Sequence, residues 1–115
     1  MHKNKDICVN AHTNPKIEAF CSITTEMADL YTKKNQNYGD SFGKLYRDLG
    51  PVAGLVPLHN KLDRLTYLIM HNDDENHYES IEDTLIDLAN YAIMNLVERR
   101  VAAQEKTCAP KEDEQ

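Results

Sequence analysis

The chain has 115 residues and a formal net charge of −6, a length that suits one domain and leaves no room for a second core. Its residues are 41% hydrophobic and 28% charged, which is ordinary for a globular protein and too apolar for a disordered one. The acidic balance argues against non-specific binding of nucleic acid, because phosphates repel such a chain at long range. Local cations or a bridging metal ion can still hold a nucleotide.

The first third of the chain predicts an arm followed by a long helix. Residues 1–13 are polar and lack periodicity, so we expect a flexible arm. A helix should begin at Asn14, an N-cap residue, with Pro15 in its first turn. Apolar residues then recur at helical spacing. The helix should end around Asn35, before a polar loop in which Gly39 can take a positive φ.

The rest of the chain predicts three further helices and a charged end. In chain order these segments are a short helix over 42–49, a turn at Gly50-Pro51, a long helix from about Pro57 to His71, a polar loop over 72–76, a last helix over 78–103 and a disordered tail over 104–115.

These segments together predict an all-α fold. There are only four Gly and four Pro, and β-branched residues are scattered, which favours helices over a sandwich or barrel. We expect a helical bundle of about three long helices and a short one, forming one domain over residues 14–103.

The sequence also indicates a compartment. Its three cysteines are widely spaced and match neither a disulfide framework nor a zinc pattern, which favours a reducing environment. No apolar run near the N-terminus resembles a secretory signal, and no stretch is long enough for a membrane span. We therefore expect a cytoplasmic protein without membrane association.

The last predicted helix carries the main candidate site. On a helical wheel its apolar residues cover almost the whole circumference, which is typical of a buried helix. Glu79, Asp83 and Asn90 nevertheless fall on one line, with Asp87 beside it. Buried carboxylates are costly unless compensated, and a spacing of four residues brings neighbouring ones within reach of one cation. Because Mg²⁺ prefers oxygen ligands, we predict a magnesium site at Glu79, Asp83 and Asp87.

A plainer interpretation of these acids stays open. Glu79 and Glu82 lie in the first turn, where acids favour the helix dipole, and Asp83 and Asp87 are then surface or salt-bridged groups. Function is favoured for Asp83, Asp87 and Asn90 together, because Asp and Asn are poor helix formers in mid-helix.

Two cations on the second long helix are candidate partners. Lys61 falls inside the apolar arc of that helix, and Arg64 lies at its edge one turn later. A lysine there either snorkels to solvent, meets the carboxylates across the helix interface, or binds a phosphate. On the first helix, Glu26 and Asp29 face away from the apolar stripe, towards solvent in a monomer or towards another subunit's acids in an oligomer.

Three sequence strings resemble a known family. They are the stretches KNQNYGDSF at 34–42, NKLDRL at 60–65 and ESIEDTLIDLANYA at 79–92. In this order, over roughly residues 17–97, they resemble the nucleotide-modification-associated domain of phages and bacteria. More distantly, the layout is similar to the all-α NTP pyrophosphohydrolases of the MazG and dimeric dUTPase group.

The resemblance implies paired helical subunits, Mg²⁺ held by acids on two helices, and attack by water that releases pyrophosphate from a nucleoside triphosphate. It assigns Glu79 and Asp83 to the second acidic helix, although their spacing is E-x-x-x-D rather than E-x-x-D. The first element of that group, E-E-x-x-E, is represented only by Glu26 and Asp29. By composition, the segment 33–41 is a loop that ends a helix. The resemblance implies that this segment is a nucleotide pocket shaped by Lys34, Asn37, Tyr38 and Asp40.

Three hypotheses follow. The first is a Mg²⁺-dependent (d)NTP pyrophosphohydrolase-like enzyme of phage or bacterial origin, in which Glu79, Asp83 and Lys61 are catalytic and Arg64 and Asn90 help to bind the nucleotide. The second is a module that sequesters a nucleotide or nucleotide-derived signal without catalysis. The third is a helical adaptor whose acids only pair with Lys61 and Arg64. In each case the apolar last helix predicts a homo-oligomer.

Overall fold

The computed structural model describes residues 14–71 and 77–108, with the backbone alone at residues 77–79 and 108. Over these residues the chain forms four helices and no strand, which confirms the all-α prediction. The predicted arm at 1–13, the predicted loop at 72–76 and residues 109–115 lie outside the described residues. The chain divides into two compact units, Met1–Asp40 and Ser41–Gln115.

The described part of the first unit is dominated by one helix, α2 (Pro15–Tyr38). The side-chain oxygen of Asn14 caps its start by accepting hydrogen bonds from Lys16 N and Ile17 N at 3.0 and 3.3 Å. The predicted end at Asn35 is three residues too early. Gly39, in the left-handed conformation at φ 64°, ends the helix by donating its N–H to Asn35 O at 3.0 Å.

One cysteine of the first unit departs from the expected pattern. Cys21 in α2 is disulfide-bonded, and no cysteine partner lies among the residues whose side chains are described. The prediction that the cysteines form no disulfide pattern is therefore wrong at this position.

The second unit begins with α3 (Ser41–Leu49) and α4 (Pro51–Met70), separated by Gly50 at φ 80°. The predicted start of α4 at Pro57 is wrong by six residues. Pro51 takes the first helical turn, where a missing N–H costs nothing, and Pro57 is accommodated inside the helix.

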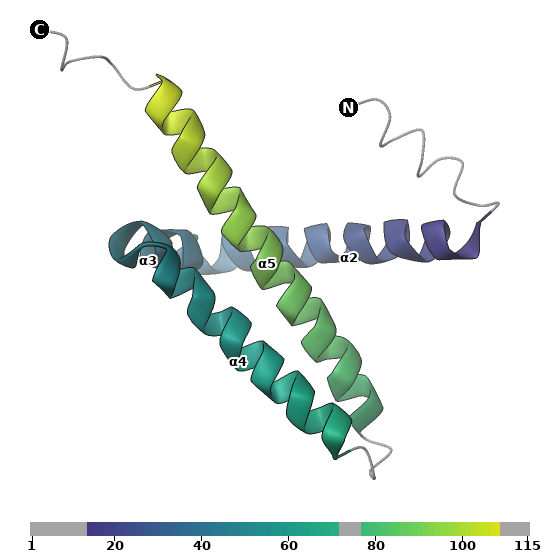
Figure 1. Ribbon diagram of the computed structural model, residues 1–115. Coiled ribbons are helices and arrows are strands. Elements are labelled where there is room, and N and C mark those ends of the chain that lie inside the picture. The colour runs from purple at the N-terminus through teal and green to yellow at the C-terminus, as the bar shows by residue number, and fades with distance from the viewer. Residues whose placement is uncertain (1–13, 72–76, 109–115) are drawn as a thin grey trace, which may run out of the picture. The chain divides into compact units, whose positions relative to one another are not determined.

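Helix α5 (His77–Cys108) completes the second unit and runs antiparallel beside α4 (Figure 1). It extends five residues beyond the predicted end at Ala103, because Gln104, Glu105 and Lys106 are good helix formers. The start of the predicted disordered tail, 104–108, is therefore helical. None of the described helices combines the length and apolar character that a bilayer crossing requires.

The α4–α5 contact holds most of the small core. Ala53, Gly54, Leu65 and Leu68 are buried on α4, and Thr84 on α5 is 2% exposed. This contact positions the charged residues of the candidate site.

Candidate functional site

An ion pair joins the two long helices of the second unit. Lys61 Nζ on α4 lies 3.1 Å from Asp87 Oδ2 on α5, and the two side chains are 30% and 34% exposed. Of the three roles that the sequence allowed for Lys61, the structure thus shows the contact with a carboxylate across the helix interface, and that carboxylate is Asp87. Because both charges still reach water, the pair contributes little to stability.

A close approach between α4 and α5, two turns from the Lys61–Asp87 ion pair, sets the register of the two helices. Asn95 Nδ2 on α5 donates to Gly54 O on α4 at 3.1 Å and to Tyr91 O at 2.7 Å. A Cβ atom at Gly54 would overlap the Asn95 carboxamide. Gly54 precedes Lys61 by seven residues, and Asn95 follows Asp87 by eight, so in an antiparallel pair both contacts share one register.

Two more charged side chains lie one turn further along the same pair of helices. Arg64 follows Lys61 on α4, Asp83 precedes Asp87 on α5, and both are exposed. The antiparallel register places them at about the same level. The expectation that the acids of the last helix are buried is therefore wrong for Asp83, whereas Asn90 is half-buried.

The carboxylates offer an incomplete metal site. Asp83 and Asp87 are one turn apart on one face of α5, and the side chain of Glu79 lies outside the described residues. Over the described part of the chain, no three His, Cys, Asp or Glu side chains gather closely enough to hold a metal ion. Two carboxylates fit Mg²⁺ when waters and substrate phosphates complete its coordination.

The predicted pocket residues of the first unit form a separate set. Lys34 and Asn37 are exposed, and Tyr38 is 70% exposed. The Asp40 carboxylate accepts a hydrogen bond from Asn35 Nδ2 at 3.1 Å, so Asp40 folds back onto the end of α2. These residues belong to one unit and Lys61, Arg64, Asp83 and Asp87 to the other, and each unit is described by itself.

The acids of the first helix also lie in this unit. Glu26 and Asp29 are both exposed on α2, as the sequence predicts for a solvated face.

Sequence reasoning missed a buried carboxylate on α5. Glu98 is 7% exposed, and its carboxylate lies 3.8 Å from Arg47 Nη1 on α3. Eleven residues, or about three turns, separate it from Asp87, which puts both acids on the same side of α5. This helical spacing from Asp87 is the sequence signal that could have identified Glu98.

An aromatic cluster on the same side of α5 was missed as well. The Phe42 ring on α3 lies 5.9 Å from that of Tyr91 on α5 and 6.2 Å from that of Tyr46. This cluster ties α3 to α5.

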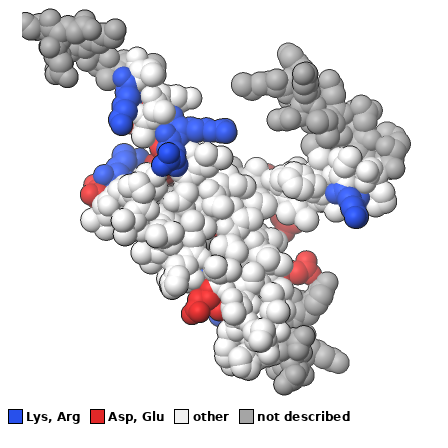
Figure 2. Space-filling view, in the orientation of Figure 1, with Lys and Arg blue, Asp and Glu red and all other residues white. Residues whose placement is uncertain are grey.

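The charges of the molecule are unevenly spread. In Figure 2, acidic surface appears beside the lower part of α4 and α5, whereas basic side chains gather towards the C-terminal end of α5. That end carries Arg99, Arg100 and Lys106.

Comparison with known proteins gives one family and no individual relative. Neither a curated protein nor a solved structure shows significant similarity to the chain. The family model described as nucleotide modification associated domain 1 matches residues 34–98, more than half of the chain. This span contains α3, α4, the Lys61–Asp87 pair and the Gly54–Asn95 contact. The chain therefore belongs to the nucleotide modification associated domain 1 family.

Proposed function

We propose that the protein binds a nucleoside triphosphate as its Mg²⁺ complex beside the Lys61–Asp87 pair and hydrolyses it to a monophosphate and pyrophosphate. The observation that carries the proposal is the Lys61–Asp87 ion pair, whose charged atoms lie 3.1 Å apart and whose side chains are about one-third exposed, with Arg64 and Asp83 one turn away. The family membership supports a nucleotide as the ligand.

The cations supply the phosphate contacts in this proposal. Lys61 turns from Asp87 to a phosphate oxygen, and Arg64 offers a planar fork that suits a second one. Both offset the charge that builds on the pyrophosphate leaving group as the bond between the α-phosphorus and the bridging oxygen breaks.

The freed carboxylates supply the other half of the site. Asp87, released by Lys61, and Asp83 are the oxygen ligands for Mg²⁺, with Glu79 as the predicted third. The ion supplies charge neutralisation and orients the phosphates. A carboxylate of this set takes a proton from the attacking water, whose oxygen becomes part of the monophosphate.

The remaining predicted groups lie in both units. Asn90 of the second unit is proposed to help bind the nucleotide, and nucleotide binding by Lys34, Asn37, Tyr38 and Asp40 of the first unit stays a prediction. The site is proposed to work in a homo-oligomer in the cytoplasm of a bacterium or a phage-infected host.

Thermal stability with a nucleotide panel tests the proposal. A ligand at about 100 times its dissociation constant stabilises the fold by about 2.7 kcal/mol. We expect stabilisation by a triphosphate with Mg²⁺, its loss in EDTA, and release of monophosphate and pyrophosphate. Asp83→Asn should abolish turnover, whereas Asp48→Asn, at an exposed acid of α3, should leave it intact. Turnover that survives Asp83→Asn would contradict the assigned site.

A second candidate is a module that holds a nucleotide without hydrolysing it. It is favoured by the incomplete first acidic element, of which the sequence holds only Glu26 and Asp29. Stabilisation of equal size in EDTA, with the nucleotide recovered intact, would select this function.

A further inference from the structure

Three aromatic side chains of the second unit gather where α3 meets α5. The rings of Phe42 and Tyr91 lie 5.9 Å apart, those of Phe42 and Tyr46 lie 6.2 Å apart, and all three side chains are half-buried. We call these three residues the α3–α5 ring cluster. Contact between the rings joins the two helices, and because the side chains are only half-buried, part of their surface still faces solvent. A flat ligand can use that remaining surface.

Tyr91 brings the ring cluster close to the Lys61–Asp87 pair. It follows Asp87 by four residues on α5, so the two share one face of the helix and lie about 6 Å apart along its axis. Asn95, four residues further along that face, donates a hydrogen bond to Gly54 O on α4. Tyr91 therefore lies between two contacts with α4, on the face of α5 that the proposed nucleotide site uses.

The charges around the ion pair leave one direction for a base. One turn before Asp87, the exposed Asp83 lies at about the level of Arg64 on α4, and these two side chains are the proposed ligands of the metal ion and of a phosphate. One turn after Asp87 comes the ring of Tyr91. A nucleotide whose phosphates lie at Lys61 would therefore extend its base towards the ring cluster.

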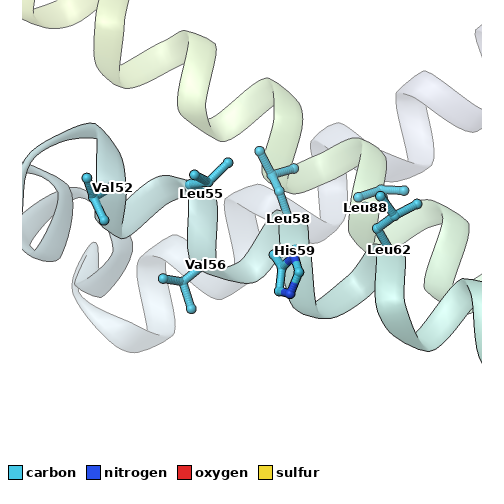
Figure 3. A pocket seen from close by; sticks show the side chains of 7 residues that line it. All are labelled: Val52, Leu55, Val56, Leu58, His59, Leu62 and Leu88. Carbon is cyan, nitrogen blue, oxygen red and sulfur yellow. The ribbon is translucent and has the colours of Figure 1, made fainter.

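An apolar hollow beside α4 is the competing position for a base. Aliphatic side chains of α4 line it, together with His59 and with Leu88 of α5 (Figure 3). Aliphatic side chains gain from contact with any apolar surface, whereas an aromatic ring stacks on the flat face of a base. The chemistry of a nucleobase thus matches the ring cluster more closely, and the hollow enters the test as the alternative.

We propose that the α3–α5 ring cluster is the nucleobase subsite of the nucleotide site, with the ring of Tyr91 stacked on the base. This inference rests on the proposed function, because a base is expected only if a nucleotide binds beside Lys61. Every base has a face that can stack, so stacking tolerates all four. The ring cluster therefore separates nucleotides from inorganic polyphosphates, and it does not choose between bases.

Calorimetric titration of the full chain tests the subsite. The ligands are inorganic tripolyphosphate and the α,β-methylene analogues of the four nucleoside triphosphates, which cannot be cleaved at that bond, each with Mg²⁺. We expect the nucleotide analogues to bind more tightly than tripolyphosphate. Tyr91→Leu should weaken their binding about 10-fold, because stacking is lost, and should leave the affinity for tripolyphosphate unchanged. Tyr91→Phe keeps a ring and should bind like the wild type.

Tyr67→Leu is the matched control for these variants. Tyr67 is 60% exposed on α4 and its ring stacks on that of His71 at 4.3 Å, so its loss should change no affinity. Circular dichroism checks that the variants remain helical. If Tyr91→Leu does not fold, NMR of the wild type replaces it, and the ring protons of Tyr91 should shift with the nucleotide analogues but not with tripolyphosphate.

Three results would overturn the inference. They are an unchanged nucleotide affinity in Tyr91→Leu, an equal loss of affinity for nucleotide and tripolyphosphate in that variant, and a loss in Leu62→Ala alone, which would place the base in the hollow. The proposed function fails in a different way. Nucleotide that depends on Tyr91 for binding but is recovered intact keeps the subsite and removes catalysis, whereas turnover that needs Asp83 and not Tyr91 keeps catalysis and removes the subsite.

Discussion

Helices α4 and α5 meet at two polar contacts that differ in kind, although only two turns separate them. At one, Asn95 donates to Gly54 O, and the Asn95 carboxamide occupies the space that a Cβ on residue 54 would need. At the other, Lys61 and Asp87 form an ion pair of which about a third is exposed. The first contact fixes the register of the helices, whereas the second is partly open to water and is the one proposed to exchange its partner for a ligand. The fold thus separates a structural contact from the proposed binding contact.

A large side chain at residue 54 is the strongest way to break the first contact. Gly54→Val displaces the Asn95 side chain and crowds the Tyr46 ring, and overpacking of this kind costs about 2–3 kcal/mol. Urea denaturation should show this loss in the free energy of unfolding. A variant as stable as the wild type would mean that the close approach is not needed to hold the helices.

The hydrogen bond itself should contribute less than the close approach. Asn95→Ala removes the bonds to Gly54 O and Tyr91 O and should cost about 1–2 kcal/mol. In that background Gly54→Ala no longer meets the carboxamide, but its Cβ comes within 3.1 Å of Tyr46 Cε2, so any gain in stability should stay below about 0.8–1.0 kcal/mol, the helix preference of Ala over Gly. A double-mutant cycle measures the coupling, and additive effects would count against direct contact.

The helices could be predicted because their signals are local. The Asn14 cap and the αL position of Gly39 are encoded within a few residues, and apolar spacing gives the rest. The start of α4 was misplaced because Pro51 and Pro57 both suit a first turn. Only packing decides between them: the segment from 51 places Ala53 and Gly54 against α5, where both are buried.

The site was only partly predictable, because its contacts also depend on how two distant helices pack. Lys61 stood out because a lysine inside an apolar arc needs a partner, and Asp87 supplies it. Asp83 appeared buried on the wheel but is exposed, since the wheel shows which residues share a face and not what covers that face. Gly54 and Asn95 carry no signal of their own, because a Gly and an Asn become a contact only once two distant helices are brought together.

Removing the lysine of the second contact should separate stability from binding. Lys61→Met should change the free energy of unfolding by no more than about 1 kcal/mol, because a partly exposed ion pair is weak. Loss of a charge-assisted hydrogen bond to phosphate should weaken nucleotide binding about 10- to 100-fold. Calorimetric titration measures the affinity, with Lys44→Met as the control because Lys44 is exposed on α3. A large loss of stability with unchanged nucleotide affinity would mean that Lys61–Asp87 is a structural contact, like the one between Asn95 and Gly54.

The smallest change in the free energy of unfolding is expected for Thr84→Val, at a residue that lies one turn before Leu88 and is 2% exposed. Its hydroxyl donates to Ser80 O at 2.6 Å, so it bonds within α5 and makes no polar link to α4. Thr84→Val keeps the shape and should alter the free energy of unfolding by no more than about 0.5 kcal/mol. Thr84→Ala leaves a gap and should cost about 1 kcal/mol or more. Chemical denaturation of both variants tells the two cases apart. If Thr84→Val lowers the free energy of unfolding more than Thr84→Ala does, the Thr84 hydroxyl forms a third polar link between the helices, beside the Asn95–Gly54 and Lys61–Asp87 contacts.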